Sequence, residues 1–298
     1  MCLWRLRRES RTVVWNHPVL SKEFRLRMRS ARTPWVLSLY LLVMGGIVLT
    51  YISLQTAGGG YFNPEGSRIL FMLLSALQLV FIGFVTPGLT AGLISGERER
   101  QTLAVLLTTN LSTASIVISK LVAALSFMTL LIVSTMPLYA IVLLFGGVSP
   151  LQFVQIFGFY FVAMFFIGSV GVLYSVLIQR TGVATVLAYA TVAVIVVGTL
   201  IVGMFAAQFY ALDQTSPQPQ MPFWVTVWFL LNPMVDFMSI FFANELPFID
   251  QTDVNPYLFF LSVYGVSGVV LLGFSIYLLP PVRRKRRDQG AWSKMERG

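Results

Sequence analysis

The chain has 298 residues, of which 56% are hydrophobic and only 11% charged, so it is too apolar for a soluble domain. Its formal net charge of +9 would suggest nucleic acid binding in a soluble protein, but here the basic residues flank apolar segments, where they favour one membrane orientation and contact with lipid headgroups. The single cysteine, Cys2, excludes an intramolecular disulfide and a cysteine metal cluster. From the high hydrophobicity and the placement of the basic residues we predict an all-α integral membrane protein without a nucleic acid partner.

Residues 1–33 form the first predicted unit, a cytosolic segment that contains an amphipathic helix. No apolar core follows the basic opening closely enough to make a signal peptide, so we expect the N-terminus to stay in the cytosol. Basic residues recur on one stripe of the helix and apolar residues on another, which favours a position in the membrane interface. This pattern fits a lipid-binding anchor, and it also fits a helix that contacts a cytosolic partner.

Residues 34–279 form the predicted transmembrane domain, and residues 280–298 form a basic cytosolic tail. About twenty apolar residues cross a bilayer as a helix, because each residue rises about 1.5 Å. Segments of this kind cover about residues 35–54, 69–94, 121–145, 151–178, 183–212 and 257–279. In the second of them Gly88, Gly92 and Gly96 stand four apart, a spacing that allows close helix packing within one subunit or a seam between two.

The most charged interruption between apolar segments runs from Ser95 to Lys120. An ionised side chain at the bilayer centre costs at least about 2.5 kcal/mol, so this segment should lie in water at one membrane face. Leucines recur at helical spacing after the charges, which predicts an amphipathic helix on the membrane surface. The charged and apolar positions that characterise the segment are Glu97, Arg98, Glu99, Arg100, Thr102, Leu103, Leu106 and Leu107.

This run, with Leu111-Ser112, Ile116 and Lys120, resembles the segment after the second membrane helix in permease subunits of type-2 ATP-binding-cassette (ABC-2) exporters. The resemblance implies that the segment is the coupling helix, which docks in a groove of a separate ATPase subunit. The family usually has Gly where this chain has Gln101 and Pro where it has Asn110. The resemblance also implies that the first amphipathic helix is the connecting helix that touches the ATPase, through Lys22, Glu23, Arg25 and Arg29.

Residues 223–248 are apolar enough to span a membrane, but Asn232-Pro233 divides them into halves that are each too short to cross. If the segment crossed, the basic run 283–287 would face outward, against the positive-inside bias. We therefore predict six spans and a re-entrant helical pair before the sixth, as the resemblance also implies. The acidic residues then expected on the outer side are Glu65, Asp213, Asp236, Glu245, Asp250 and Asp253.

Catalytic groups are scarce. Each lysine is followed by a residue other than Ser or Thr, so the chain has no GxxxxGK[ST] phosphate loop. His17 is the only histidine, which excludes a HExxH zinc site and a Ser-His-Asp triad inside the membrane. We find no ionisable residue inside the six predicted spans away from their ends, so ion-driven transport is not favoured. Gln78, Thr86 and Thr90 could line a substrate path, although polar residues in membrane helices mostly bond their own backbone.

These observations favour a non-enzymatic permease subunit of an ATP-driven exporter in the cell membrane. Two permeases, identical or related, would form the pathway as a dimer, and two copies of an ABC ATPase would bind ATP and Mg²⁺; this chain itself would carry no cofactor or metal. Membrane lipid would surround it, and both termini would be cytosolic. The alternative is a membrane anchor or scaffold that recruits a cytosolic partner without transporting anything.

Overall fold

The computed structural model describes residues 32–57, 64–102, 113–213, 222–242 and 254–279, and these residues are helical with short connections. The helices of the first half are α2 (Arg32–Ala57), α3 (Pro64–Thr90), α4 (Ser95–Glu99), α6 (Thr113–Ser134) and α7 (Met136–Leu144). Those of the second half are α8 (Pro150–Leu177), α9 (Thr181–Ala193), the π-helical turn η1 (Val194–Gly198), α10 (Thr199–Asp213), α11 (Phe223–Leu230), α12 (Pro233–Phe242) and α13 (Pro256–Leu278). No strand occurs in these described parts of the chain.

Six helical segments are long and apolar enough to cross a membrane: Pro34–Ala57, Pro64–Glu99, Thr113–Leu144, Pro150–Leu177, Thr181–Phe209 and Pro256–Leu278. This confirms the predicted six spans. The pair α11 and α12 is bent by 95° at its break, and it would count as a seventh span only if the two helices were taken together. The break follows from the sequence, because Pro233 cannot donate a backbone hydrogen bond and starts a new helix instead.

α8 is the central helix of the bundle, and α3, α6, α9 and α13 pack around it. Its start is fixed locally: Ser149 and Gln152 form a capping box, and Pro150 occupies the first turn. Aromatic side chains fill the core beside it, and the rings of Phe159 and Phe260 stack 4.0 Å apart between α8 and α13. Such ring pairs add specific attraction to the burial of their area.

The glycine series of the second span packs against α9 of the same chain. A Cβ atom at Gly88 would lie 3.1 Å from the Tyr189 hydroxyl, and one at Gly92 would lie 3.1 Å from the Thr181 methyl group. Gly96 faces Thr181 as well, at 3.8 Å. Of the two alternatives for this spacing, the structure therefore contains the close packing within one subunit.

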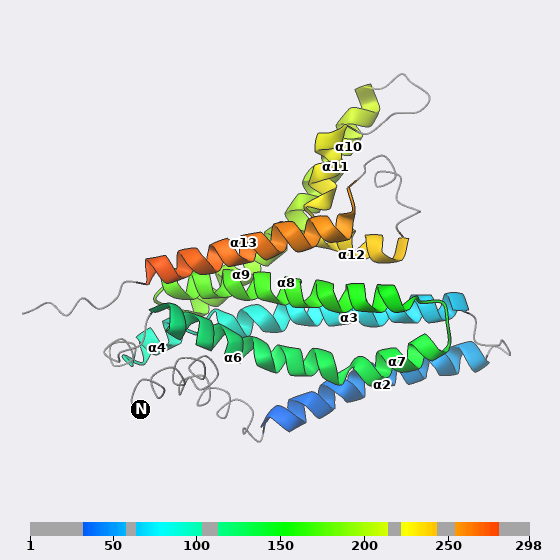
Figure 1. The fold of residues 1–298 in the computed structure, drawn as a ribbon, viewed down its shortest axis with the longest axis horizontal. Helices are drawn as coiled ribbons and strands as arrows, with labels where there is room; N and C mark the ends of the chain where they lie inside the picture. The colour runs from blue at the N-terminus through cyan, green and yellow to red at the C-terminus, as the bar shows by residue number, and fades with distance from the viewer. Residues whose placement is uncertain (1–31, 58–63, 103–112, 214–221, 243–253, 280–298) are drawn as a thin grey trace, which may run out of the picture.

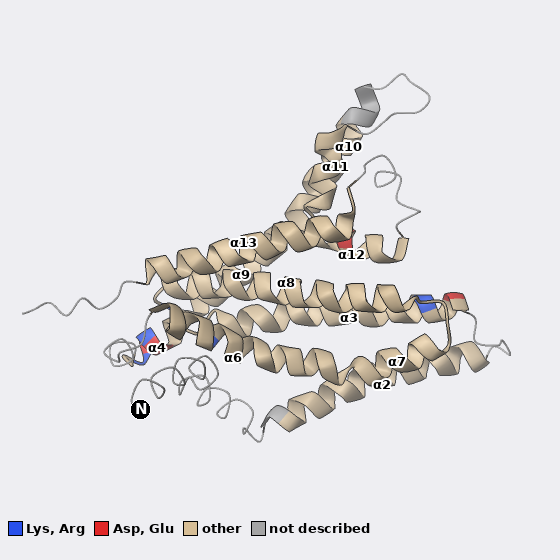
Figure 2. Ribbon diagram, viewed as in Figure 1, with Lys and Arg blue, Asp and Glu red and all other residues tan. Residues whose placement is uncertain are grey.

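The charged residues of the described helices lie mainly near the ends of the bundle (Figure 2). The C-terminal end of α13 and α4 lie at the same end (Figure 1), where Leu279, Ile94 and Val176 belong to one buried apolar cluster. Away from that end, α12 is anchored by its last carbonyl groups: the Arg68 guanidinium donates to the Phe241 carbonyl, and the Gln152 amide donates to the Ile240 carbonyl at 3.0 Å. These contacts satisfy backbone acceptors that the end of a helix leaves unpaired.

Asp236, predicted on the outer side of the membrane, lies in α12, at the end of the bundle away from α4 (Figure 1). Its side chain is fully buried, and neither carboxyl oxygen has a hydrogen-bond partner among the described residues. The neighbouring positions Phe237 and Phe241 belong to the aromatic core, so this face of α12 is buried.

Candidate functional site

The junction between α3 and α4 is a tight backbone turn held by a residue of α8. The turn covers residues 91–94, and it leaves the amides of Ile94 and Ser95 to be satisfied from outside the helix. The Ser175 hydroxyl accepts from both amides, at 2.8 Å and 3.0 Å. This small buried hydroxyl therefore fixes where the second span ends and in which direction α4 leaves it.

Glu97 joins α4 to α6 through an ion pair. Its carboxylate lies 2.5 Å from the Lys120 ammonium, and the two side chains are only 24% and 5% exposed. Lys120 lies inside α6, which begins at Thr113, before the predicted start of the third span at residue 121. The lysine can be buried because an acidic partner 23 residues earlier in the chain meets it there.

Arg98 and Glu99 join α4 to two further helices. The Arg98 guanidinium donates to the Val176 carbonyl, at the end of α8, at 3.3 Å. The Glu99 carboxylate accepts from the backbone amide of Thr181, the first residue of α9, at 2.7 Å. This bond lowers the pKa of Glu99, which is exposed and lies beyond the turn that ends α3. A carboxylate at a helix N-terminus also interacts favourably with the helix dipole.

A Schellman motif ends α4. The Gln101 amide donates to the Arg98 carbonyl at 3.1 Å, and the Thr102 amide donates to the Glu97 carbonyl at 3.0 Å. This motif requires a left-handed residue, and Gln101 has a φ of 58°. Because glycine adopts this conformation without strain, the motif gives a physical reason for the Gly usually found at this position in the family that the segment resembles.

The structure thus places part of the predicted coupling segment. Glu97, Arg98 and Glu99 contact three helices of their own chain, whereas Arg100 and Thr102 are exposed. Several predicted positions lie outside the described residues, and their roles stay predictions: Leu103, Leu106 and Leu107 of the coupling helix, and Lys22, Glu23, Arg25 and Arg29 of the connecting helix.

The residues predicted for a substrate path, Gln78, Thr86 and Thr90, are all fully buried in the interior of this chain. The Gln78 side chain accepts from the Tyr40 hydroxyl, and the Thr90 hydroxyl donates to the Thr86 carbonyl at 2.8 Å. The second contact is the ordinary backbone bonding considered as the alternative. Their role in a substrate path stays a prediction.

Sequence reasoning missed Ser175, Val176 and Thr181, which contact α4 in addition to Lys120. Only the polar position of Thr181, at a loop after α8, carried a local signal. Among the described residues, no group of three or more His, Cys, Asp or Glu could hold a metal ion. The arrangement holds helices together by charge and hydrogen bonds.

The comparisons with known proteins agree with this arrangement. A family model described as ABC-2 family transporter protein matches residues 17–273 and so covers most of the chain. A search of curated proteins finds no match. The family match includes the first five spans, the bent pair, the junction at α4 and most of the sixth span, and this multi-pass membrane protein therefore belongs to the ABC-2 transporter family.

Proposed function

We propose that this permease component of an ABC transporter forms half of an export pathway, and that α4 transmits movement of a cytosolic ATPase to the spans. An ABC ATPase is the general partner of such a permease. The observation that carries the proposal is that Glu97, Arg98 and Glu99 bond α6, α8 and α9 in turn. A displacement of α4 would therefore pull on the third, fourth and fifth spans together.

The orientation of the chain supports this role. α13 ends at the same end of the bundle as α4, and the basic run 283–287 follows shortly after that end in the sequence. Basic residues next to a span favour the cytosolic side. We therefore assign the α4 end to the cytosol of a cell membrane, together with both termini, where an ATPase could reach it.

The proposed mechanism is mechanical. Two copies of the chain, or this chain and a related permease, enclose the pathway, and two ATPases bind ATP and Mg²⁺. When the ATPases close, they push the segment that follows Thr102. Burial of each leucine of that segment in an ATPase groove would contribute roughly 1.5 to 3 kcal/mol, enough to hold the segment in the groove during the movement.

The test is a charge placed on the docking face. Leu106→Asp should uncouple ATP hydrolysis from transport in proteoliposomes that contain the full complex, while membrane insertion stays normal. Thr108→Asp is the matched control, because helical spacing places residue 108 on the opposite side from Leu103, Leu106 and Leu107. Normal transport by Leu106→Asp would contradict the coupling mechanism, and purification without any ATPase or nucleotide-dependent change would favour the scaffold alternative.

A further inference from the structure

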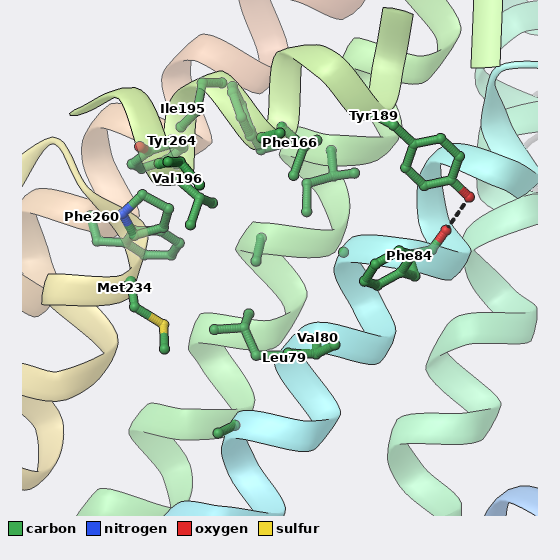
Figure 3. A pocket seen from close by; sticks show the side chains of 18 residues that line it. Leu79, Val80, Phe84, Phe166, Tyr189, Ile195, Val196, Met234, Phe260 and Tyr264 are labelled. Carbon is green, nitrogen blue, oxygen red and sulfur yellow. Dashed lines mark hydrogen bonds between the residues drawn. The ribbon is translucent and has the colours of Figure 1, made fainter. Parts of the chain in front are cut away.

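An apolar cavity of about 610 Å³ lies at mid-span between α3, α8, α9, η1, α12 and α13 (Figure 3). Its volume falls in the range of about 300 to 1,000 Å³ that is usual for small-molecule sites. None of the residues predicted from the sequence for a substrate path lines it. The cavity is therefore separate from that predicted path.

Small residues create the space. Ala76 and Gly83 line the cavity from α3, Ala163 lines it from α8, and Ala193 lines it from the end of α9. A Cβ atom added at Gly83 would meet no atom within 4 Å. A larger side chain at this position would therefore occupy the cavity without a collision at its first carbon.

Hydrogen bonds hold two walls of the cavity in place. Ile195, Val196 and Val197 of η1 form one wall, and Pro233 and Met234 of α12 form another. The side-chain amide of one residue, Asn232, donates to the Val196 carbonyl at 2.6 Å and to the Thr199 hydroxyl at 2.9 Å.

The same Asn232 side chain also accepts from the Met234 amide at 2.8 Å, so it caps the start of α12. Asn232 thus joins the π-helical turn η1 to the break before α12. π-helical turns are frequent at functional sites. The bonds to both walls indicate a built cavity, because a packing defect would need no such tie between them.

The chemistry of the lining selects the occupant. Among the described residues, no charged side chain lines the cavity, and its two hydroxyl groups already donate hydrogen bonds. Tyr189 donates to the Phe84 carbonyl at 2.6 Å (Figure 3), and Tyr264 donates to the Leu231 carbonyl at 2.7 Å. A polar ligand would lose its hydrogen bonds to water there and would find no free hydrogen-bond donor in the cavity wall. A hydrocarbon chain has no hydrogen bonds to lose.

The cavity also opens to the outer surface of the bundle. Val80, Phe84 and Val197 line it and are each more than half exposed. These residues lie in the middle of spanning helices, where the surrounding medium is lipid hydrocarbon. We propose that the cavity between α3 and η1 binds one acyl chain of a membrane phospholipid, in a site that needs neither nucleotide nor the ATPase.

The test uses the full-length chain in lipid nanodiscs that contain a phosphatidylglycerol with a diazirine near the end of one acyl chain. After illumination, peptide mapping should locate adducts on the lining residues of α3 and η1 in excess over the lipid-facing side of α2. Gly83→Leu should lower that labelling about tenfold, the loss expected when the new side chain displaces about two methylene contacts.

Gly46→Leu is the matched control, because Gly46 lies on α2, is exposed and also has nothing within 4 Å of an added Cβ. It should label like the wild type. If Gly83→Leu does not fold, Ala76→Leu on the same wall takes its place. Uniform labelling of all exposed helices, no labelling of α3 and η1 because a second copy covers them, or unchanged labelling in the filled variant would each overturn the proposal.

Discussion

The ion pair between Glu97 and Lys120 should contribute measurably to stability, although it lies at one end of the bundle. Lys120→Met keeps the length of the side chain and removes its charge. The Lys120 side chain is 5% exposed, and Glu97 Oε2 is buried without a hydrogen-bond partner among the described residues. The substitution would therefore leave a carboxylate that water reaches only in part.

The expected cost follows from this partial burial. Removal of one partner of a fully buried pair costs about 3 to 5 kcal/mol, whereas exposed pairs contribute less than about 1 kcal/mol. Because Glu97 is 24% exposed, we expect an intermediate loss of about 2 kcal/mol for Lys120→Met. Glu97→Gln combined with Lys120→Met removes both charges and should recover at least about 1 kcal/mol of that loss.

The assay is a double-mutant cycle on the free energy of unfolding, measured by titrating the protein in mixed micelles with a denaturing detergent and following helicity. Arg100→Met is the control, because Arg100 is exposed and its loss should change the free energy by no more than about 0.5 kcal/mol. A single variant as stable as the wild type, or a double variant no better than Lys120→Met, would refute the reasoning.

Three further predictions concern the same junction and the bent pair. Gln101→Gly should stabilise the protein by about 1 kcal/mol, because glycine adopts the left-handed conformation of this residue without strain, whereas the β-branched side chain of Gln101→Val should destabilise it. Unfolding in denaturing detergent measures both changes. Asn232→Ala should cost about 1 to 3 kcal/mol, because the Val196 carbonyl and the start of α12 lose their partner; hydrogen exchange should then rise in η1 and α12 but not in α4. The pKa of Glu99 is lower in the folded state than its ordinary 4.5, so the stabilisation from its ionised form is fully present above pH 4.5 and is lost as pH falls through the lowered pKa. Glu99→Gln should therefore flatten the acid side of a plot of thermal stability against pH, and an unchanged acid side would contradict this assignment.

The amino-acid sequence was sufficient to predict the membrane class, the six spans and the bent pair. Each of these depends on local properties: the length of an apolar run, the charge at its ends, and the inability of Pro233 to continue a helix. The resemblance of the segment from Glu97 to Lys120 indicated the family, and the family match over residues 17–273 confirms it. Nothing beyond neighbouring residues was needed for these conclusions.

The tertiary structure alone decided how the polar residues are used. Lys120 was expected in water because it is charged. Its burial was not predictable, because the sequence around a lysine does not show that Glu97 of another helix pairs with it. The burial of Asp236 by the aromatic residues of its helix face was likewise not predictable from its charge. The contact of Asn232 with η1 likewise joins residues 36 positions apart. Apolar segments and helix breaks are determined by neighbouring residues, whereas the burial of a charged or amide side chain depends on which distant residue packs against it.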